Sequence, residues 1–147
     1  MSDIRDVWMH ANSMIRSARQ IINEGLRPLN LSSAEGNILL HLLTQGQEMR
    51  QEQLVEQLDI SKPAVSRALD SLEKKGYVTR LKDPDDRRAH RVWLTDKALE
   101  IGPAIEHIYN HVYELAVQGI SQNEIDGCIE LFSRVSQNYT CAQAKKG

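Results

Sequence analysis

Cysteine and aromatic residues are scarce in this sequence of 147 residues, and each scarcity excludes a class of protein. The two cysteines, Cys128 and Cys141, are too few for a disulfide framework or a four-cysteine zinc site. Aromatic residues make up 5% of the chain, and Phe132 is the only phenylalanine. No apolar run approaches the roughly 18 residues that a membrane span requires, and residues 1–6 lack the apolar stretch of a signal peptide. We therefore expect a cytoplasmic globular domain with reduced thiols, alone or with an attached assembly element.

Residue groupings typical of catalytic sites are also missing. The sequence has no evident nucleophile beside a base, no glycine-rich loop suited to phosphate and no evident pair of acid–base carboxylates. We therefore expect a protein that is not an enzyme and that needs no cofactor.

The net charge of −2 hides a basic segment. Residues 61–91 contain nine basic and five acidic side chains, a net charge of +4, so the rest of the chain carries −6. A basic block within an acidic protein localises an electrostatic surface for a polyanion. A solvated charged loop would have the same composition, so charge alone does not decide between the two.

The spacing of apolar residues predicts helices along most of the chain. These residues recur at steps of three and four, which places them on one face of each helix. Cap residues mark the starts and glycines mark most of the ends, and Pro103 should bend the long fifth helix. The expected helices run from Ile4 to a stop at Gly25 and Pro28, from Ser32 to Gly46, from Gln51 to Leu58, from Ser61 to Gly76, from Thr95 or Asp96 to Gly119, and from Ser121 into a frayed tail at 142–147.

One β-hairpin interrupts the helices. Residues 77–82 and 90–94 alternate in polarity and are rich in β-formers, and the polar segment 83–89 between them predicts a turn-rich tip. Two short helices, a tight connection at Asp59 and Ile60, a third helix and a hairpin together indicate a winged helix-turn-helix. The expected fold class is therefore mainly α with a small β-hairpin wing, combined with a helical dimerisation region.

The predicted helix at 61–75 has an outer face that suits a DNA groove. Opposite its apolar side lie small, polar and basic residues: Pro63, Ser66, Arg67, Asp70 and Lys74. We expect Arg67 to bind a guanine edge, since base edges are read by residues near the helix N-terminus. Ser61 and Ser66 are expected to bond a base or a phosphate, and Lys74 to meet a phosphate.

Asp70 is the acidic residue on this face. It either accepts a hydrogen bond from a cytosine amine or holds Arg67 or Lys74 at helical spacing, and we favour the second interpretation. The face is also compatible with an ordinary solvent-exposed helix surface, but the basic hairpin beside it favours DNA.

The tip of the hairpin supplies a second expected contact. Arg87 and Arg88 project from a narrow ribbon that can enter a minor groove, whose negative potential attracts arginine. Asp86 lies two residues before Arg88, so in an extended strand the two share a face and the carboxylate can orient the guanidinium.

Five stretches between Leu31 and Thr95 resemble the MarR family of bacterial and archaeal transcriptional regulators. They are Leu31-Ser32, ISKPAVSR at 60–67, LEKKGYV at 72–78, DPDDRRA at 83–89 and Leu94-Thr95. The likeness covers about Leu31 to Thr95, and the flanking helices match in pattern and length alone. Lys97-Ala98-Leu99 replaces the Lys-Gly pair usual in the family, a departure from which we expect no functional consequence.

The resemblance implies a homodimer in which the first helix and the last two helices of each chain intertwine. It also implies binding to a pseudo-palindromic operator in double-stranded DNA, usually as a repressor, and Asp86-Arg87-Arg88 matches the Asp-x-Arg motif of the family wing. We therefore expect residues 31–95 to bind DNA, and 1–30 with 96–147 to form the dimerisation region. The expected DNA contacts are Ser61, Lys62, Pro63, Ser66, Arg67, Lys74, Arg87, Arg88 and Arg91, with Asp86 orienting the wing.

Apolar patterning supports a dimer independently of the resemblance. The stripe of the first helix, the heptad-like seam of the long helix and the Phe132 face of the last helix all need burial. Helices packed between two chains would cover them. The alternative function is a winged-helix protein-interaction module without sequence-specific DNA binding.

A ligand that binds between the helical region and the winged domain commonly releases DNA in relatives. The first, second and fifth helices line that region, and Arg16 and His41 are the candidates to meet an anionic or phenolic effector. A surface arginine and a hydrogen-bonded histidine are the ordinary alternative for these two residues.

Other candidate sensors are weaker. His107, His111 and Glu114 share a face of the long helix and could bind zinc, but a solvated helix face is the ordinary explanation, so we expect no metal site. We expect Cys128 to be a core thiol, because it falls beside apolar residues, and Cys141 to be exposed in the tail.

Overall fold

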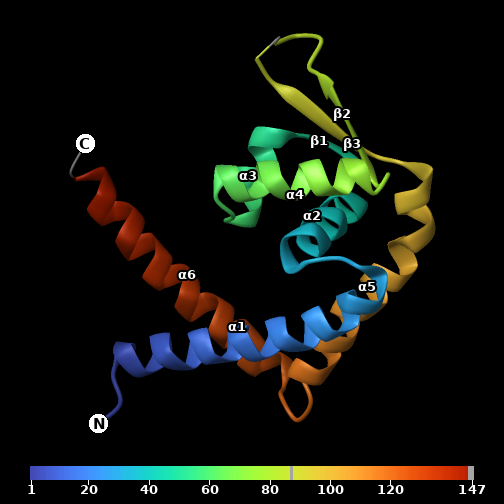
Figure 1. The fold of residues 1–147 in the computed structure, drawn as a ribbon. Coiled ribbons are helices and arrows are strands. Elements are labelled where there is room, and N and C mark those ends of the chain that lie inside the picture. The colour runs from blue at the N-terminus through green and yellow to red at the C-terminus, as the bar shows by residue number, and fades with distance from the viewer. Residues whose placement is uncertain (87, 146–147) are drawn as a thin grey trace. The chain divides into compact units, whose positions relative to one another are not determined.

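The computed structural model describes residues 1–86 and 88–145, which form helices and one small sheet (Figure 1). The elements in chain order are α1 (Ile4–Leu26), the 3-10 helix η1 (Arg27–Leu29), α2 (Ser33–Thr44), β1 (Glu48–Arg50), α3 (Gln51–Leu58), α4 (Lys62–Lys74), β2 (Val78–Lys82), β3 (His90–Leu94), α5 (Asp96–Ala116) and α6 (Gln122–Ala144). The expected fold class is confirmed. The chain divides into two compact units, residues 1–112 and 113–147.

Side-chain caps explain where the helices of the first unit begin. Ser61 Oγ accepts a hydrogen bond from the Ala64 N–H at 3.3 Å, with a proline in the first turn of α4. Thr95 Oγ1 accepts from the Ala98 N–H at 3.3 Å. Of the two residues proposed to cap α5, Thr95 therefore makes the cap, and Asp96 is the first residue of the helix.

Gly25 does not end the first helix, which corrects the sequence-based expectation. α1 continues through Leu26, and a 3-10 turn that contains Pro28 follows it. A Cβ atom on Gly25 would lie 2.8 Å from Ile108 Cγ2 of α5, closer than two carbons can approach. Glycine is needed at this position because α1 packs tightly against α5.

The core of the first unit lies between α2, α3, α4 and the sheet, which gather together in Figure 1, and α1 and α5 also contribute buried side chains to it. Its fully covered side chains are Leu26, Ile38, Leu39, Leu42, Leu54, Val65, Leu69, Leu72, Val92 and Ile105. The connection from α3 to α4 turns at Asp59, whose φ of 52° is left-handed. This tight connection fixes α4 across α3, as the helix-turn-helix prediction requires.

The sheet has three antiparallel strands in the order β1-β3-β2, whereas the sequence predicted two. β1 was missed because it has three residues, of which Met49 alone is buried, so no alternation could reveal it. Its register with β3 places Arg50 opposite Arg91. β3 is therefore the central strand, paired on both edges.

The second unit contains the end of α5 and all of α6. Ser121 caps α6, as predicted, and Glu124 completes the capping box. No residue of α6 in the described part is buried within this single chain. Cys128 is exposed in this single chain, so the prediction that it is a core thiol is wrong. The predicted exposure of Cys141 is confirmed.

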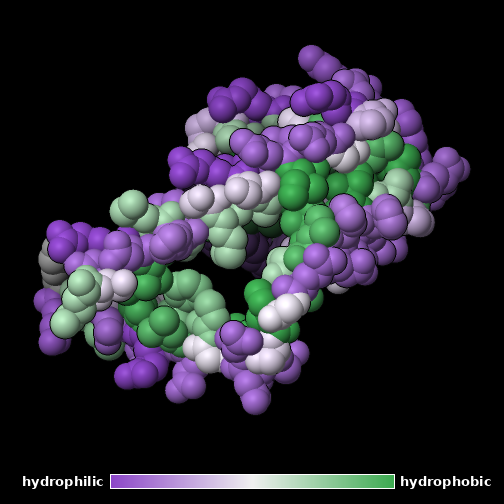
Figure 2. Space-filling model, turned by 90° about the horizontal axis from the view of Figure 1, so that it is seen from below, coloured by the Kyte–Doolittle hydropathy of each residue, from purple (hydrophilic) through white to green (hydrophobic). Residues whose placement is uncertain are grey.

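Apolar side chains also reach the surface of α1 (Figure 2). Trp8 is 52% exposed and Met14 62%, and Ile4, Met9 and Ile15 are similarly open. No helix in the described part of the chain is long and apolar enough to cross a membrane.

Glu35 is one of two buried charged side chains among the described residues, and it links α2 to α4. It closes the capping box of α2 by accepting from the Ser32 N–H at 3.0 Å. Its carboxylate also lies 2.9 Å from Lys75 Nζ and accepts from Ser71 Oγ at 3.0 Å. Lys75 Nζ in turn donates to the Asn30 carbonyl at 2.6 Å. The C-terminal end of α4 is thereby fixed to the start of α2.

We expect Glu35→Gln to lower the free energy of unfolding by about 2 kcal/mol at neutral pH, because the Lys75 ammonium loses its buried partner. Burial raises the pKa of Glu35, but hydrogen bonds from Lys75, Ser32 and Ser71 outweigh it and leave the pKa below its ordinary 4.5. The stabilisation is therefore present above the unfolded pKa and lost as pH falls through the folded pKa. Below about pH 5, stability should fall less in the variant than in the wild type.

Urea denaturation at neutral and acidic pH measures both effects. Glu124→Gln is the matched control, since Glu124 closes the same kind of capping box in α6 but is exposed. The Glu124 variant should lose clearly less stability than Glu35→Gln, because its carboxylate is open to water. Equal losses in the two variants would contradict a stabilising role for the Lys75 pair.

Candidate nucleic-acid interface

α4 presents two chemically different sides. Val65, Ala68, Leu69 and Leu72 are buried in the core, as the helical spacing predicted. On the other side, four of the residues expected to meet DNA are exposed: Lys62, Pro63, Arg67 and Lys74. Ser66, also expected to meet DNA, is partly covered. The helix therefore offers a small, basic surface to a partner, and the contacts assigned to each residue stay predictions.

Asp70 does not hold Arg67 or Lys74, which corrects the interpretation favoured from the sequence. Its carboxylate pairs with the Arg80 guanidinium of β2. Glu73 also binds Arg80, through its Oε1 at 3.2 Å from Nη2 and its Oε2 at 3.3 Å from the backbone N. Helical spacing indicates neighbours along α4 alone, whereas the partner of Asp70 comes from a strand packed against that helix.

The lysines and arginines between residues 50 and 91 fall into two groups. Arg50, Lys75, Arg80 and Arg91 are each bound to carboxylates. Among the residues that the structure describes, a second group makes no side-chain hydrogen bond or ion pair: Lys62, Arg67, Lys74, Lys82 and Arg88. The unpaired group lies on the outer side of α4 and on the wing, where its charge is available to an anionic partner.

Arg91 was expected to contact DNA, and the structure gives it two partners within the chain. Its Nε lies 3.2 Å from Asp83 Oδ2, and its Nη1 donates to Glu48 Oε1 at 3.1 Å. A DNA contact from Arg91 stays a prediction. Arg87, also expected to contact DNA, lies outside the described residues.

Asp86 does not contact the Arg88 guanidinium in the way the sequence predicted, and its role in orienting the wing stays a prediction. Asp86 and Arg88 lie in the turn between β2 and β3, so they do not share a face of an extended strand. Asp86 Oδ1 accepts a hydrogen bond from the backbone N–H of Arg88 at 3.0 Å. The carboxylate therefore shapes the backbone of the tip, and the guanidinium of Arg88 remains unpaired with it.

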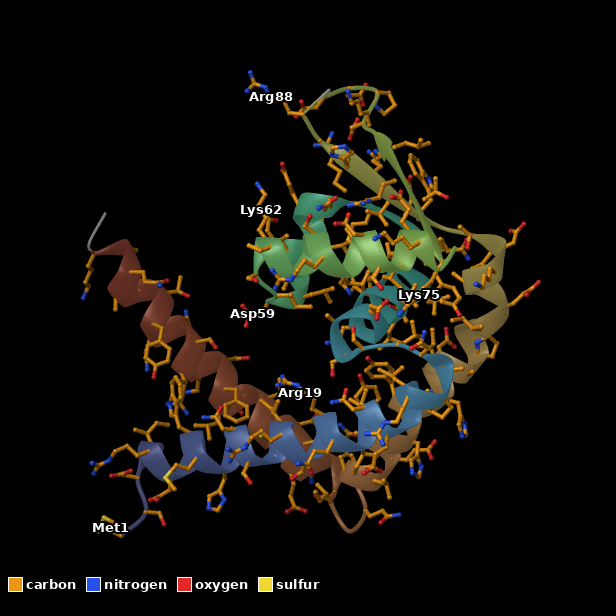
Figure 3. All side chains as sticks on the ribbon, viewed as in Figure 1. Met1, Arg19, Asp59, Lys62, Lys75 and Arg88 are labelled. Carbon is orange, nitrogen blue, oxygen red and sulfur yellow. The ribbon has the colours of Figure 1, made fainter. Side chains whose placement is uncertain are left out.

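The start of α4 and the wing come together around a shared hollow. Lys62 and Arg88 both line it, with His90 and Val55. Figure 3 shows Lys62 at the start of α4, with Lys75 at the opposite end of that helix and Arg88 at the tip of the hairpin. A second hollow, lined by Ser66 and His90 among others, separates α4 from the hairpin. His90 lines both hollows and was not among the predicted site residues, because its position in the sequence indicates only the start of a strand.

The candidate effector residues do not surround the hollows described. Arg16 is exposed on α1. His41 of α2 is partly covered, and its Nε2 lies 2.5 Å from Gln57 Oε1 of α3. Neither residue lines the two hollows beside the wing or a third hollow near Asn30 and Lys75. Their effector role stays a prediction, and the hydrogen-bonded histidine matches the ordinary alternative.

The weak zinc candidates do not assemble into a ligand set. Across residues 1–86 and 88–145, no group of three or more histidine, cysteine or acidic side chains could hold a metal ion. His107, His111 and Glu114 are exposed side chains of α5.

The sequence and the fold are both similar to those of known regulators. A model of the MarR family matches residues 31–90. The transcriptional regulator PA3341 is 30% identical over 91% of this chain and 98% of its own, with a TM-score of 0.82. A MarR transcriptional regulator from Methanosarcina mazei Go1 is 25% identical over 92% of this chain and 99% of its own, with a TM-score of 0.80.

A third similar structure was solved with a nucleic acid. It is a protein from Listeria monocytogenes assigned to the MarR family of transcriptional regulators, in complex with 26mer DNA. It is 26% identical over 100% of this chain and 97% of its own, with a TM-score of 0.79. The motifs, the family match and the likeness over nearly the whole length of a 30% identical regulator place this chain in the MarR family of transcriptional regulators.

Proposed function

We propose that this chain is a ligand-responsive repressor that binds a pseudo-palindromic DNA operator as a homodimer in the cytoplasm. The observation that carries the proposal is the group of unpaired cations on α4 and the wing, beside other cations that carboxylates neutralise. Free positive charge on a helix and an adjacent ribbon suits the major groove and the neighbouring minor groove. The DNA complex of the similar Listeria protein supports this use of the fold.

In this proposal residues 31–95 bind DNA, and residues 1–30 with 96–147 hold the dimer. Exposed apolar side chains on α1 and α6 support the second part, because a stable chain seldom leaves side chains such as Met14 and Phe132 this open to water without a partner surface. Packing of these helices between two chains would bury both.

The alternative is a winged-helix module that binds another protein. The two functions differ in their response to salt, because neutralising phosphates releases counterions from DNA. Fluorescence anisotropy with duplexes from the promoter region of its own gene should show tight binding that falls steeply as salt rises. Absence of binding to every such duplex at low salt would exclude the proposed function.

We expect Arg67→Ala to weaken operator binding by ~1–3 kcal/mol and to relax discrimination against base changes in each half-site, since Arg67 faces base edges. Arg88→Ala should weaken operator and unrelated duplexes more evenly and reduce the salt slope by about one phosphate per wing. Both losses should be larger on the full palindrome than on a half-site, because each substitution occurs twice in a dimer.

Salt titrations of wild type and both variants on operator, half-site and scrambled duplexes measure these effects. Arg19→Ala, the same change at an exposed position of α1, is the matched control and should leave the salt slope unchanged. If Arg67→Ala weakens all duplexes equally while Arg88→Ala changes base preference, the two roles are assigned the wrong way round.

Removing residues 121–147 should abolish the dimer, because α6 supplies an apolar face formed by Ile125, Ile129, Phe132 and Val135. Sedimentation of the truncated chain should show monomer or aggregate, since the surfaces that α6 covers in the proposed dimer become exposed. A stable, non-aggregating dimer after truncation would contradict the proposed dimerisation region.

A further inference from the structure

Asp83 is a buried carboxylate at the base of the wing tip, directly after β2. Its side chain is 0% exposed, although the sequence places it in a polar, turn-rich segment. Its Oδ2 lies 2.8 Å from Arg50 Nε and 3.2 Å from Arg91 Nε. Its Oδ1 accepts a hydrogen bond from the Asp85 N–H at 2.9 Å. One carboxylate therefore joins two strands and the tip.

The strand register explains why a carboxylate is needed at this position. Arg50 of β1 and Arg91 of β3 are directly opposite each other in the ladder. Two like charges in that relation destabilise a sheet unless anions separate them. Asp83 lies against both guanidinium groups, and Glu48 binds Arg91 from the other side, so two cations meet two anions.

The hydrogen bonds of the tip start from the same residue. The Asp83 N–H donates to the Ala89 carbonyl at 2.9 Å, which closes the hairpin, and its carbonyl accepts from the Asp86 N–H at 3.3 Å. Asp86 then holds the backbone N–H of Arg88. A continuous path of polar contacts thus runs from Asp83 to the unpaired arginine of the wing.

The same carboxylate also ties the tip to the helix-turn-helix. Arg50 occupies the cap position of α3, and its N–H donates to Gln53 Oε1 at 3.0 Å. The backbone hydrogen bond from Asp85 lowers the pKa of Asp83, and the charges of Arg50 and Arg91 lower it further against the effect of burial. Asp83 is therefore ionised at neutral pH and can hold both arginines.

We propose that Asp83 is a positioning residue for DNA binding, which holds the wing and its Arg88 in place through ion pairs with Arg50 and Arg91. The proposal rests on the proposed function. A wing that is already fixed loses little conformational freedom when it enters a groove, whereas a loose wing must be ordered at the expense of affinity.

For the loss of the Asp83 charge, this role predicts a change in DNA affinity opposite in sign to the one that simple electrostatics predicts. Removing an acidic charge beside a polyanion should by itself strengthen DNA binding. Loss of the positioning contacts should weaken it. Asp83→Asn removes the charge but keeps an acceptor for the Asp85 N–H, and Asp85→Asn removes the same charge from the exposed side chain two residues away.

The experiment compares full-length wild type, Asp83→Asn and Asp85→Asn on operator and scrambled duplexes, titrated with salt. We expect Asp83→Asn to bind the operator roughly three- to tenfold more weakly, because a wing that is no longer held in place must be ordered when it binds. The salt slope should be reduced by about one phosphate per wing. Asp85→Asn should bind as tightly as wild type or more tightly.

A double variant gives a readout that a merely structural role would not move. If Asp83 acts through Arg88, Asp83→Asn should cost much less in an Arg88→Ala background than in wild type, because the contact it positions is already absent. Circular dichroism and urea denaturation establish that each protein is folded. If Asp83→Asn does not fold, Arg50→Lys carries the test with the same criteria, since it keeps net charge but removes the Nε–H that Asp83 binds.

The possible outcomes separate this proposal from the one it rests on. Failure of the wild type to bind any duplex would overturn the proposed function, and the positioning role with it. Wild-type binding with Asp83→Asn equal to Asp85→Asn, or fully additive losses with Arg88→Ala, would overturn the positioning role alone.

Discussion

Pairing between buried carboxylates and cations is the interaction on which the arrangement of α4 and the wing depends. Glu35 and Asp83 are the two charged residues that burial isolates from water in the described part of the chain. An unpaired carboxylate in such a place would strongly destabilise the fold, so the cationic partners of Glu35 and Asp83 must stay close to them. Glu35 fixes the end of α4 through Lys75. Asp83 fixes the wing to β1 and the start of α3 through Arg50.

These pairs also decide which cations remain available. The whole segment at 61–91 has a net charge of only +4, yet its acids are not spread evenly among its bases. Asp70 and Glu73 neutralise Arg80, so the carboxylates on the surface of α4 are engaged at its contact with β2. Positive charge is left uncompensated further out, on α4 and the tip. The field that an approaching polyanion meets is therefore stronger than the net charge indicates.

Local sequence signals predicted the local structure well, and partners from distant segments escaped them. The bounds of α3 were predicted to the residue, because apolar spacing sets that helix within the chain itself. The prediction for Gly25 was wrong because a glycine can indicate either the end of a helix or a place where two helices pack closely. The helix that packs against Gly25 is α5, which lies far along the chain. The partners of Asp70 and the burial of Asp83 depend on strand packing and on a three-residue strand that has no detectable period. Polar composition at 83–89 correctly predicted a turn, but it carried no information on which of its acids faces inward.

Two-fold symmetry makes the fixed wing more important in the proposed dimer than it would be in a single chain. Two α4 helices and two wings must fit one duplex at the same time, so an error in the position of one wing strains the contacts of the other half-site. Flexible wings would have to be ordered twice in every binding event. Contacts that hold each wing before DNA arrives remove that requirement for both. In the proposed dimer, the apolar faces of α1 and α6 would serve the same end, because a large dimer surface would set the spacing between the two wings while Asp83 holds each wing in position.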